Sequence, residues 1–254
     1  MNLKIKHFVA FITIISFVSC NQAPQELSKI NANQINVDST FASDEAIQNF
    51  ITPYQNRVNE VLDSTLTYAP FTLTKTDGEL NTSAGNLMAD VILSEANPIF
   101  KSRTNKNIDF SLVNHGGVRS IISKGNVSAR NAYEIMPFEN SIVVVELTPE
   151  SVLEMVDFLI RSKRAHPISG MQIIVDKNNE LHTLNIQGKP FSKAQNYYVA
   201  TSNYLVKGGD NMGFFKNKIS VTDTDYLIRT AMIDYFKKVD TLKVKVDDRF
   251  YQLK

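Results

Sequence analysis

Residues 108–119 read IDFSLVNHGGVR and join a hydrophobic run to a glycine turn. The start of this stretch has the length and mostly apolar character of a buried strand. Gly116 and Gly117 permit a tight turn and a close backbone approach to a ligand, because neither has a Cβ atom. Asn114 and Arg119 flank them with an amide and a guanidinium, which can make forked contacts with phosphate oxygens. The stretch predicts a site for an anion or a hydroxyl-rich ligand, although an ordinary turn with a surface arginine has the same pattern.

A second glycine turn occurs at residues 204–211 (YLVKGGDN). Gly208 and Gly209 lead into Asp210, whose carboxylate can accept two hydrogen bonds from a ribose diol, as acidic residues do in other nucleotide sites. The alternative for the same residues is a turn that ends in an aspartate capping a helix. The pattern therefore predicts either a hydroxyl-binding carboxylate or a helix cap.

Two aromatic residues belong to the same part of the sequence pattern. Tyr204 opens the second turn, and Phe138 lies in the stretch MPFEN at residues 136–140. Two such rings can hold a purine or a pyrimidine between them, because every base has a π-face. Aromatic residues also build protein cores, so a core position is the alternative for both rings.

The rest of the body alternates between helical and strand-like hydrophobic periods. A first helix is expected from Asp44, with a kink or a delayed start at Pro53. Further helices are expected at 84–96, 149–160 and 223–236, and strands at 108–113, 141–147, 171–175, 181–186 and 197–201. The strands around the turn at 177–179 form a hairpin, so the sheet is not wholly parallel. The sequence predicts a single α/β domain with a mixed sheet.

The N-terminus has the features of a secretory signal. Residues 1–19 contain two lysines, then an uncharged stretch, then a serine directly before Cys20. The apolar stretch is roughly half of the about 20 residues that a spanning helix needs. Cys20 is the only cysteine, and its setting FVSC resembles the lipobox of bacterial lipoproteins; an unmodified cysteine near a signal peptide is the alternative. We expect an exported protein that a lipid on Cys20 anchors in the bacterial cell envelope, in the periplasm or at the outer membrane.

Composition sets the limits of the domain and argues against nucleic-acid binding. Residues 20–43 are rich in Asn, Gln and Ser and poor in large apolar side chains, so we expect a flexible tether followed by one domain at 44–254. Two of the 27 Lys and Arg residues lie in residues 1–19, which leaves 25 against 26 Asp and Glu. A nucleic-acid-binding protein is expected to show a basic excess, so we expect no nucleic-acid partner.

Five ordered blocks resemble one known family. The blocks are AGNLMAD (84–90), NHGGVR (114–119), PFEN (137–140), SG (169–170) and GGD (208–210). In this order they resemble the C-terminal domain of the 5′-nucleotidase/UDP-sugar hydrolase family, over residues 74–215. The resemblance implies an α/β domain of the α+β kind, with layered helices and sheets, that binds the nucleoside part of a substrate.

The resemblance also implies a set of substrate-binding residues. The asparagine of this set would contact the base, the arginine the phosphate or the ribose side, the two rings would sandwich the base, and the aspartate would hold the ribose hydroxyls. The set is Asn114, Gly116, Gly117, Arg119, Phe138, Tyr204, Gly208, Gly209 and Asp210. The family usually has a further arginine before the AGNLMAD block, where this chain has Lys75 beside Asp77 and Glu79. Weaker phosphate binding is expected, because lysine lacks the fork of arginine and the carboxylates repel a phosphate.

The metal-bearing catalytic half of that family has no counterpart in this sequence. A two-metal phosphoesterase site needs several carboxylates, an asparagine and multiple histidines. The Asp-x-His, Gly-Asp-x-x-Asp, Gly-Asn-His and Gly-His-x-His blocks of such domains do not occur. We expect no catalytic residue and no cofactor in this chain, with divalent metals only in a separately encoded calcineurin-like metallophosphoesterase as its partner. The alternatives are a stand-alone nucleoside- or nucleotide-binding lipoprotein and a remnant whose pocket no longer works.

Overall fold

The computed structural model describes residues 3–18 and 27–253. The chain divides into two units, residues 1–50 and 51–254. The predicted lipidation site, Cys20, lies outside the described residues and stays a prediction.

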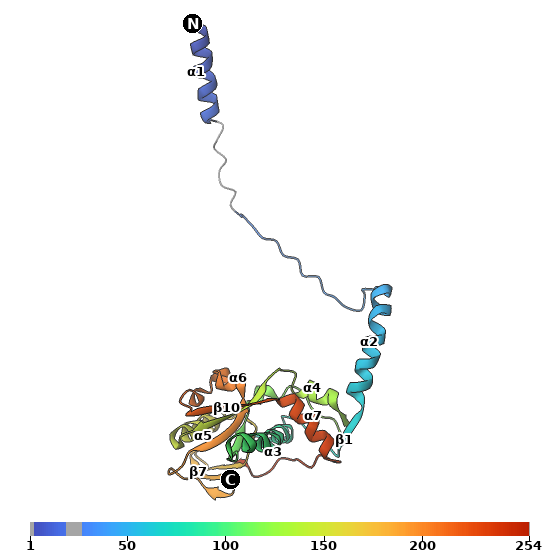
Figure 1. Cartoon of the computed structure of the whole chain (residues 1–254), viewed down its shortest axis with the longest axis vertical. Helices are drawn as coiled ribbons and strands as arrows, with labels where there is room; N and C mark the ends of the chain where they lie inside the picture. Colours follow the sequence, from blue (N-terminus) through green and yellow to red (C-terminus); the bar gives the residue numbers. More distant parts are fainter. Residues whose placement is uncertain (1–2, 19–26, 254) are drawn as a thin grey trace. The chain divides into compact units, whose positions relative to one another are not determined.

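Two helices lie in the N-terminal part of the chain (Figure 1). Helix α1 (Leu3–Val18) covers most of the predicted signal, and no helix in the described parts of the chain has the length and apolar character needed to cross a membrane. Residues 27–44 contain no helix or strand. Helix α2 (Glu45–Asp63) begins directly after Asp44, whose carboxylate accepts hydrogen bonds from two backbone amides at 2.9 and 3.0 Å. The helix continues through Pro53, so the proline does not delay its start.

A five-stranded mixed sheet forms the centre of the second unit, in the order β10-β4-β9-β2-β5. The strands in this order are Ser220–Leu227, Ser141–Leu147, Tyr197–Ser202, Phe110–Leu112 and Ile168–Ser169. Strands β2 and β9 run parallel, whereas the other neighbouring pairs run antiparallel. The predicted α/β fold with a mixed sheet is confirmed.

Two smaller sheets complete the second unit. A four-stranded sheet has the order β11-β6-β7-β8, and a two-stranded sheet pairs β1 with β3. These strands are Phe250–Gln252, Met171–Val175, Leu181–Ile186, Lys189–Pro190, Thr65–Ala69 and Gly125–Ser128, respectively. Strands β6 and β7 are antiparallel and consecutive, which confirms the predicted hairpin.

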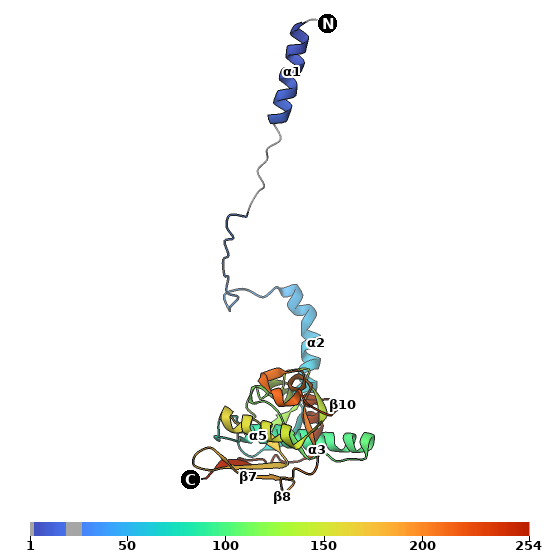
Figure 2. The same ribbon diagram turned by 90° about the vertical axis from the view of Figure 1, so that its left-hand side faces the viewer.

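Helices cover the central sheet on both faces. Helices α3 (Ser83–Thr104) and α7 (Ile228–Lys238) pack on one face and α5 (Pro149–Ser162) on the other, whereas α4 (Ala129–Ile135) packs against α7 and β3, and α6 (Asn203–Val206) follows β9. One hydrophobic cluster joins α3 and α7, which lie side by side in Figure 1, to the sheet through Ile142 and Val144 of β4. Val145 and Leu147 point to the opposite face, because side chains alternate along a strand, and join a second cluster with α5 and the four-stranded sheet. Figure 2 shows β7 and β8 along that side of the body.

The predicted helix at 223–236 is wrong over its first five residues. These residues belong to β10, which pairs with β4 and contains an irregularity between Asp223 and Tyr226. Thr224, within the irregularity, donates its hydroxyl to the carbonyl of Ile142 at 2.6 Å. Helix α7 therefore begins only at Ile228. Helix α3 also runs eight residues further than the predicted 84–96, through a proline, to a left-handed cap at Asn105.

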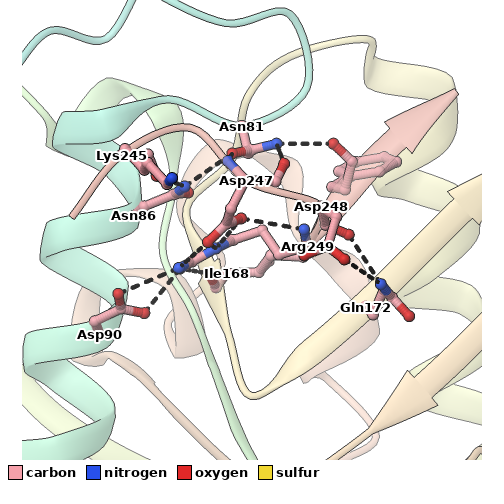
Figure 3. Close-up of polar contacts among 10 residues, drawn as sticks. Asn81, Asn86, Asp90, Ile168, Gln172, Lys245, Asp247, Asp248 and Arg249 are labelled. Atoms are coloured by element: carbon pink, nitrogen blue, oxygen red, sulfur yellow. Dashed lines mark hydrogen bonds and ion pairs between the residues drawn. The ribbon is translucent and has the colours of Figure 1, made fainter. Parts of the chain in front are cut away.

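The C-terminal segment is fastened to the body by polar contacts around Arg249 (Figure 3). The Arg249 guanidinium donates to the carboxylate of Asp90 on α3 at 2.8 and 3.2 Å, and to the carbonyl of Ile168 on β5 at 2.8 Å. It also donates to Asp247 at 2.7 Å. Asp90 belongs to the AGNLMAD block, so this part of the motif has a structural role. The contacts tie the edge strand β5 to α3.

Candidate functional site

A cavity of about 300 Å³ opens on the second unit. Its lining comes from three segments, namely the residues after β2, the residues before β4 and the residues after β9. The lining residues are Asn114, Gly116, Gly117, Arg119, Phe138, Asn140, Tyr204 and Asp210. Seven of the nine residues predicted to bind a substrate are among them.

The strand order explains why these distant segments meet. Strands β2 and β9 are parallel neighbours, so the segments that follow them leave the sheet at the same edge. Strand β4 runs antiparallel to β9, with Ile142 opposite Ser202. The segment that precedes β4 therefore enters the sheet at that edge.

The glycine turn after β2 is a single 3₁₀ turn, η1 (His115–Gly117), in which the amide of Gly117 donates to the carbonyl of Asn114 at 2.9 Å. A Cβ atom on Gly117 would lie 3.0 Å from Asn114 Oδ1, and one on Gly116 would lie 3.2 Å from Asn114 Nδ2. The two glycines thus leave room for the side chain of Asn114, a residue that is 8% exposed.

Asp210 connects two sides of the cavity. Its Oδ2 accepts a hydrogen bond from Asn114 Nδ2 at 2.7 Å, and its Oδ1 accepts one from the Tyr204 hydroxyl at 3.0 Å. Each carboxylate oxygen has a second lone pair, so Asp210 can still accept hydrogen bonds from a ligand. Asp210 lies in the short turn η2 (Gly209–Asn211), and its φ of 50° is in the left-handed region.

The two predicted stacking residues line the same cavity and are both accessible. The exposed fractions are 42% for Phe138 and 44% for Tyr204. The Arg119 guanidinium lies over the Phe138 ring, 5.8 Å from its centroid, and Arg119 Nη1 donates to the carbonyl of Gly116 at 3.4 Å. The alternative of a core position therefore does not apply to either ring.

Gly208 and Gly209 do not line the cavity, in contrast to the other predicted substrate-binding residues. Gly208 has a φ of +100°, which favours glycine. A Cβ atom on Gly209 would lie 2.3 Å from a ring atom of Tyr204. The physical role of this glycine pair in the structure is to form the turn and to leave space for the Tyr204 ring.

Two residues near the cavity were not in the predicted set. Asn140 lines the cavity, and its position in the PFEN block was the available signal. Lys75 donates its ammonium to the carbonyl of Val118 at 3.0 Å, directly beside Arg119 in the sequence. The neighbouring Asp77 accepts a hydrogen bond from the amide of Ser83 at 3.0 Å at the start of α3. Lys75 thus brings a second positive charge next to the turn that carries Arg119.

The turn at Asn114 is also supported by a buried histidine. His166 is 4% exposed, and its Nδ1 lies 3.2 Å from the backbone nitrogen of His115. Burial lowers the pKa of His166 to about 4, and the neighbouring His115 contributes in the same direction. Within residues 3–18 and 27–253, no three His, Cys, Asp or Glu side chains form a group that could hold a metal ion.

Comparison with other proteins identifies relatives. A family model for the 5′-nucleotidase C-terminal domain matches residues 64–217. Protein UshA of Escherichia coli is 29% identical over 141 residues, which cover 54% of this chain and 26% of that protein. The cell wall protein Lmo0130 of Listeria monocytogenes is 25% identical over 242 residues, which cover 79% of this chain and 31% of that protein. The chain thus spans about a quarter to a third of the length of these relatives.

Solved structures share the fold. The 5′-nucleotidase precursor of Thermus thermophilus superposes with a TM-score of 0.68 and 20% identity, over 81% of this chain and 43% of that one. The NAD nucleotidase of Haemophilus influenzae gives a TM-score of 0.63 and 17% identity, over 83% of this chain and 42% of that one. Because the family model also matches more than half of the residues, the chain belongs to the 5′-nucleotidase C-terminal domain family.

Proposed function

We propose that this chain binds a nucleoside or a nucleotide in the cavity between the three segments. The observation that supports the proposal best is that two accessible rings, Phe138 and Tyr204, and the carboxylate of Asp210 line one cavity. Rings that are exposed in a cavity offer a stacking surface for a base. The free lone pairs of the carboxylate suit the hydroxyls of a ribose.

Phosphate recognition in this proposal depends on a small number of positive charges. Arg119 lines the cavity and can make forked contacts with phosphate oxygens. Lys75, bound to the carbonyl of Val118, adds a charge close to that position. The lysine offers a point charge without fixed geometry, so a monophosphate is expected to improve binding only modestly over the nucleoside.

We propose further that the chain is the recognition component of a 5′-nucleotidase-like hydrolase and acts with a separate metallophosphoesterase chain. The support for this part is the sequence, which contains the ligand-contacting blocks of the family and lacks the metal-binding ones. The role would be in nucleotide breakdown in the cell envelope, with the chain anchored at Cys20. One relative is named a cell wall protein, which supports such a location. A stand-alone binding lipoprotein is the alternative.

Calorimetric titration with adenosine and adenosine monophosphate tests the binding proposal. We expect both ligands to bind, and Phe138→Ala and Asp210→Asn to weaken binding roughly tenfold each, the range expected for a lost base stack or a lost charged hydrogen bond. Phe71→Ala and Asp240→Asn are matched controls, because both residues are exposed and do not line the cavity. Unchanged affinity in the cavity variants, or no binding of either ligand, would contradict the proposal.

An activity assay distinguishes the recognition component of a two-chain hydrolase from a stand-alone binding lipoprotein. The full chain with added divalent metal is expected to release no phosphate from nucleoside monophosphates, and a metallophosphoesterase encoded by a neighbouring gene is expected to gain activity when the chain is added. Phosphate release by the chain alone would overturn the two-chain account. Binding without any effect on such an enzyme would favour the stand-alone lipoprotein.

A further inference from the structure

The edge strand β5 and the residues before it run alongside the glycine turn of the cavity. Strands β2 and β5 are antiparallel, with Leu112 opposite Ile168. Beyond the end of β2 the pairing continues, because the amide of Val113 donates to the carbonyl of Pro167 at 3.0 Å. The next contact uses a side chain, since the amide of His115 donates to Nδ1 of His166 at 3.2 Å. The histidine thus takes the place of a backbone acceptor at the point where the turn begins.

These contacts determine where the protons of the two imidazoles lie. A backbone amide can only donate, so Nδ1 of His166 has no proton and the ring carries its proton on Nε2. In contrast, Nδ1 of His115 lies 3.2 Å from the carbonyl of Ala165, which can only accept, so this nitrogen is protonated. Two hydrogen bonds therefore join residues 165–166 to the turn. The backbone amide of His115 donates in one, and the imidazole of His115 donates in the other.

We propose that His166 is a positioning residue for the nucleoside or nucleotide cavity: its neutral ring fixes the His115 amide, and thereby holds Asn114 in place against Asp210. The peptide bond that His166 holds is the one that joins Asn114 to His115. Asn114 in turn donates to Asp210 at 2.7 Å, so a shift of this peptide disturbs both residues. For the identity of the ligand, the inference rests on the function proposed above. The contact itself does not depend on it.

Protonation of His166 breaks this arrangement. A second proton would occupy Nδ1 and point at the His115 amide hydrogen, so the two donors would repel each other. The charged groups that act on His166 are His115 and Arg164, which oppose its protonation, and Asp210, which favours it. The ring of Phe158 on α5 packs against His166, with centroids 5.8 Å apart. Acid is therefore expected to release the turn.

Nuclear magnetic resonance of the full chain tests the contact without any ligand. We expect His166 to show the Nε2-protonated form at neutral pH and to titrate with a midpoint of about 4, as burial lowers its pKa. The backbone amides of His115, Gly116 and Gly117 are expected to shift with the same midpoint. A proton on Nδ1 at neutral pH, a midpoint close to the ordinary histidine value of 6.5, or turn amides that do not shift with His166 would each overturn the proposal.

Variants of His166 test its effect on binding. In His166→Asn the amide oxygen can still accept from the His115 amide and cannot be protonated. We expect this variant to bind adenosine as the unmodified chain does at neutral pH and to lose the acid-dependent shift of the turn amides. His166→Leu keeps a bulky apolar side chain without an acceptor and is expected to bind roughly tenfold more weakly, because the part-buried His115 amide loses its partner. His182→Asn is the matched control, since His182 is exposed on β7.

The outcomes separate this inference from the function on which it rests. If adenosine does not bind to the unmodified chain, the proposed function fails, and the amide shifts still decide whether His166 holds the turn. If adenosine binds and His166→Leu, shown to be folded by circular dichroism, binds equally well, the positioning role is wrong. The positioning role is also wrong if His166→Asn binds adenosine as weakly as His166→Leu does.

Discussion

Gly209 controls the position of Tyr204 although it does not line the cavity. A Cβ atom at this position would lie 2.3 Å from the Tyr204 ring, so Gly209→Ala must displace the ring or the turn. Base stacking on an aromatic ring is worth about 1–3 kcal/mol. We therefore expect Gly209→Ala to weaken adenosine binding about tenfold in a calorimetric titration. Gly213→Ala is the control, because its Cβ atom would meet nothing within 4 Å; equal affinities of the two variants would contradict this account.

The cavity residues that could be predicted from the sequence are those that lie in a recognisable local pattern. Asp210 after two glycines and Asn114 before two glycines are patterns that can be recognised locally. Lys75 was singled out only through the family resemblance, as the residue in place of an arginine, and His166 was not assigned to the site. Lys75 reaches the cavity turn by a contact with Val118, and His166 by one with His115, and both contacts exist only once distant segments have folded together.

At the scale of elements, strands and helices with a clear period were predicted well, and the start of α7 was not. Residues 223–227 fit a helical pattern with the residues that follow, yet they pair with β4 in the sheet. Pairing partners far away in the sequence provide the hydrogen bonds for this strand, so tertiary context overrides the local pattern. The left-handed conformation of Asp225, with a φ of 54°, is part of the irregularity that precedes the helix.

The polar contacts of Arg249 are expected to stabilise the folded chain by joining α3, β5 and the C-terminal segment. The Arg249 side chain is 14% exposed, and Arg249→Met leaves the carboxylates of Asp90 and Asp247 without their partner. Breaking a buried ion pair costs about 3–5 kcal/mol, and the partial exposure of both carboxylates reduces the expected loss in the free energy of unfolding to about 2–3 kcal/mol. Urea unfolding measures this loss.

The control for that prediction is an exposed ion pair on helix α2. Arg57 pairs with Glu60, and both side chains are about 70% exposed. Arg57→Met is expected to change the free energy of unfolding by less than about 1 kcal/mol, because exposed pairs contribute little. An Arg249→Met variant as stable as Arg57→Met would show that the contacts in Figure 3 do not hold the C-terminal segment.

At the scale of the whole molecule, the cavity depends on the order of strands in the central sheet. The parallel pair β2 and β9 and its antiparallel neighbour β4 bring three separate segments to one edge. Local patterns predict each strand, but the order of strands depends on packing between all of them. The resemblance to a known family supplied what the periodicity could not, namely that these segments belong to one site.

The stability of the whole molecule is expected to depend on pH through His166. Its pKa is lowered from 6.5 to about 4 in the folded chain, so the unfolded chain binds more protons between these values. The free energy of unfolding therefore falls as the pH drops from 6.5 to 4, by about 3 kcal/mol in total, and this contribution is constant below and above that range. Urea unfolding at several pH values measures it. His166→Asn removes the titrating group, so its curve is expected to lack this loss, whereas the exposed-residue control His182→Asn follows the unmodified chain. A constant difference between the curves of His166→Asn and the unmodified chain from neutral to acid pH would show that His166 is not kept neutral by the fold.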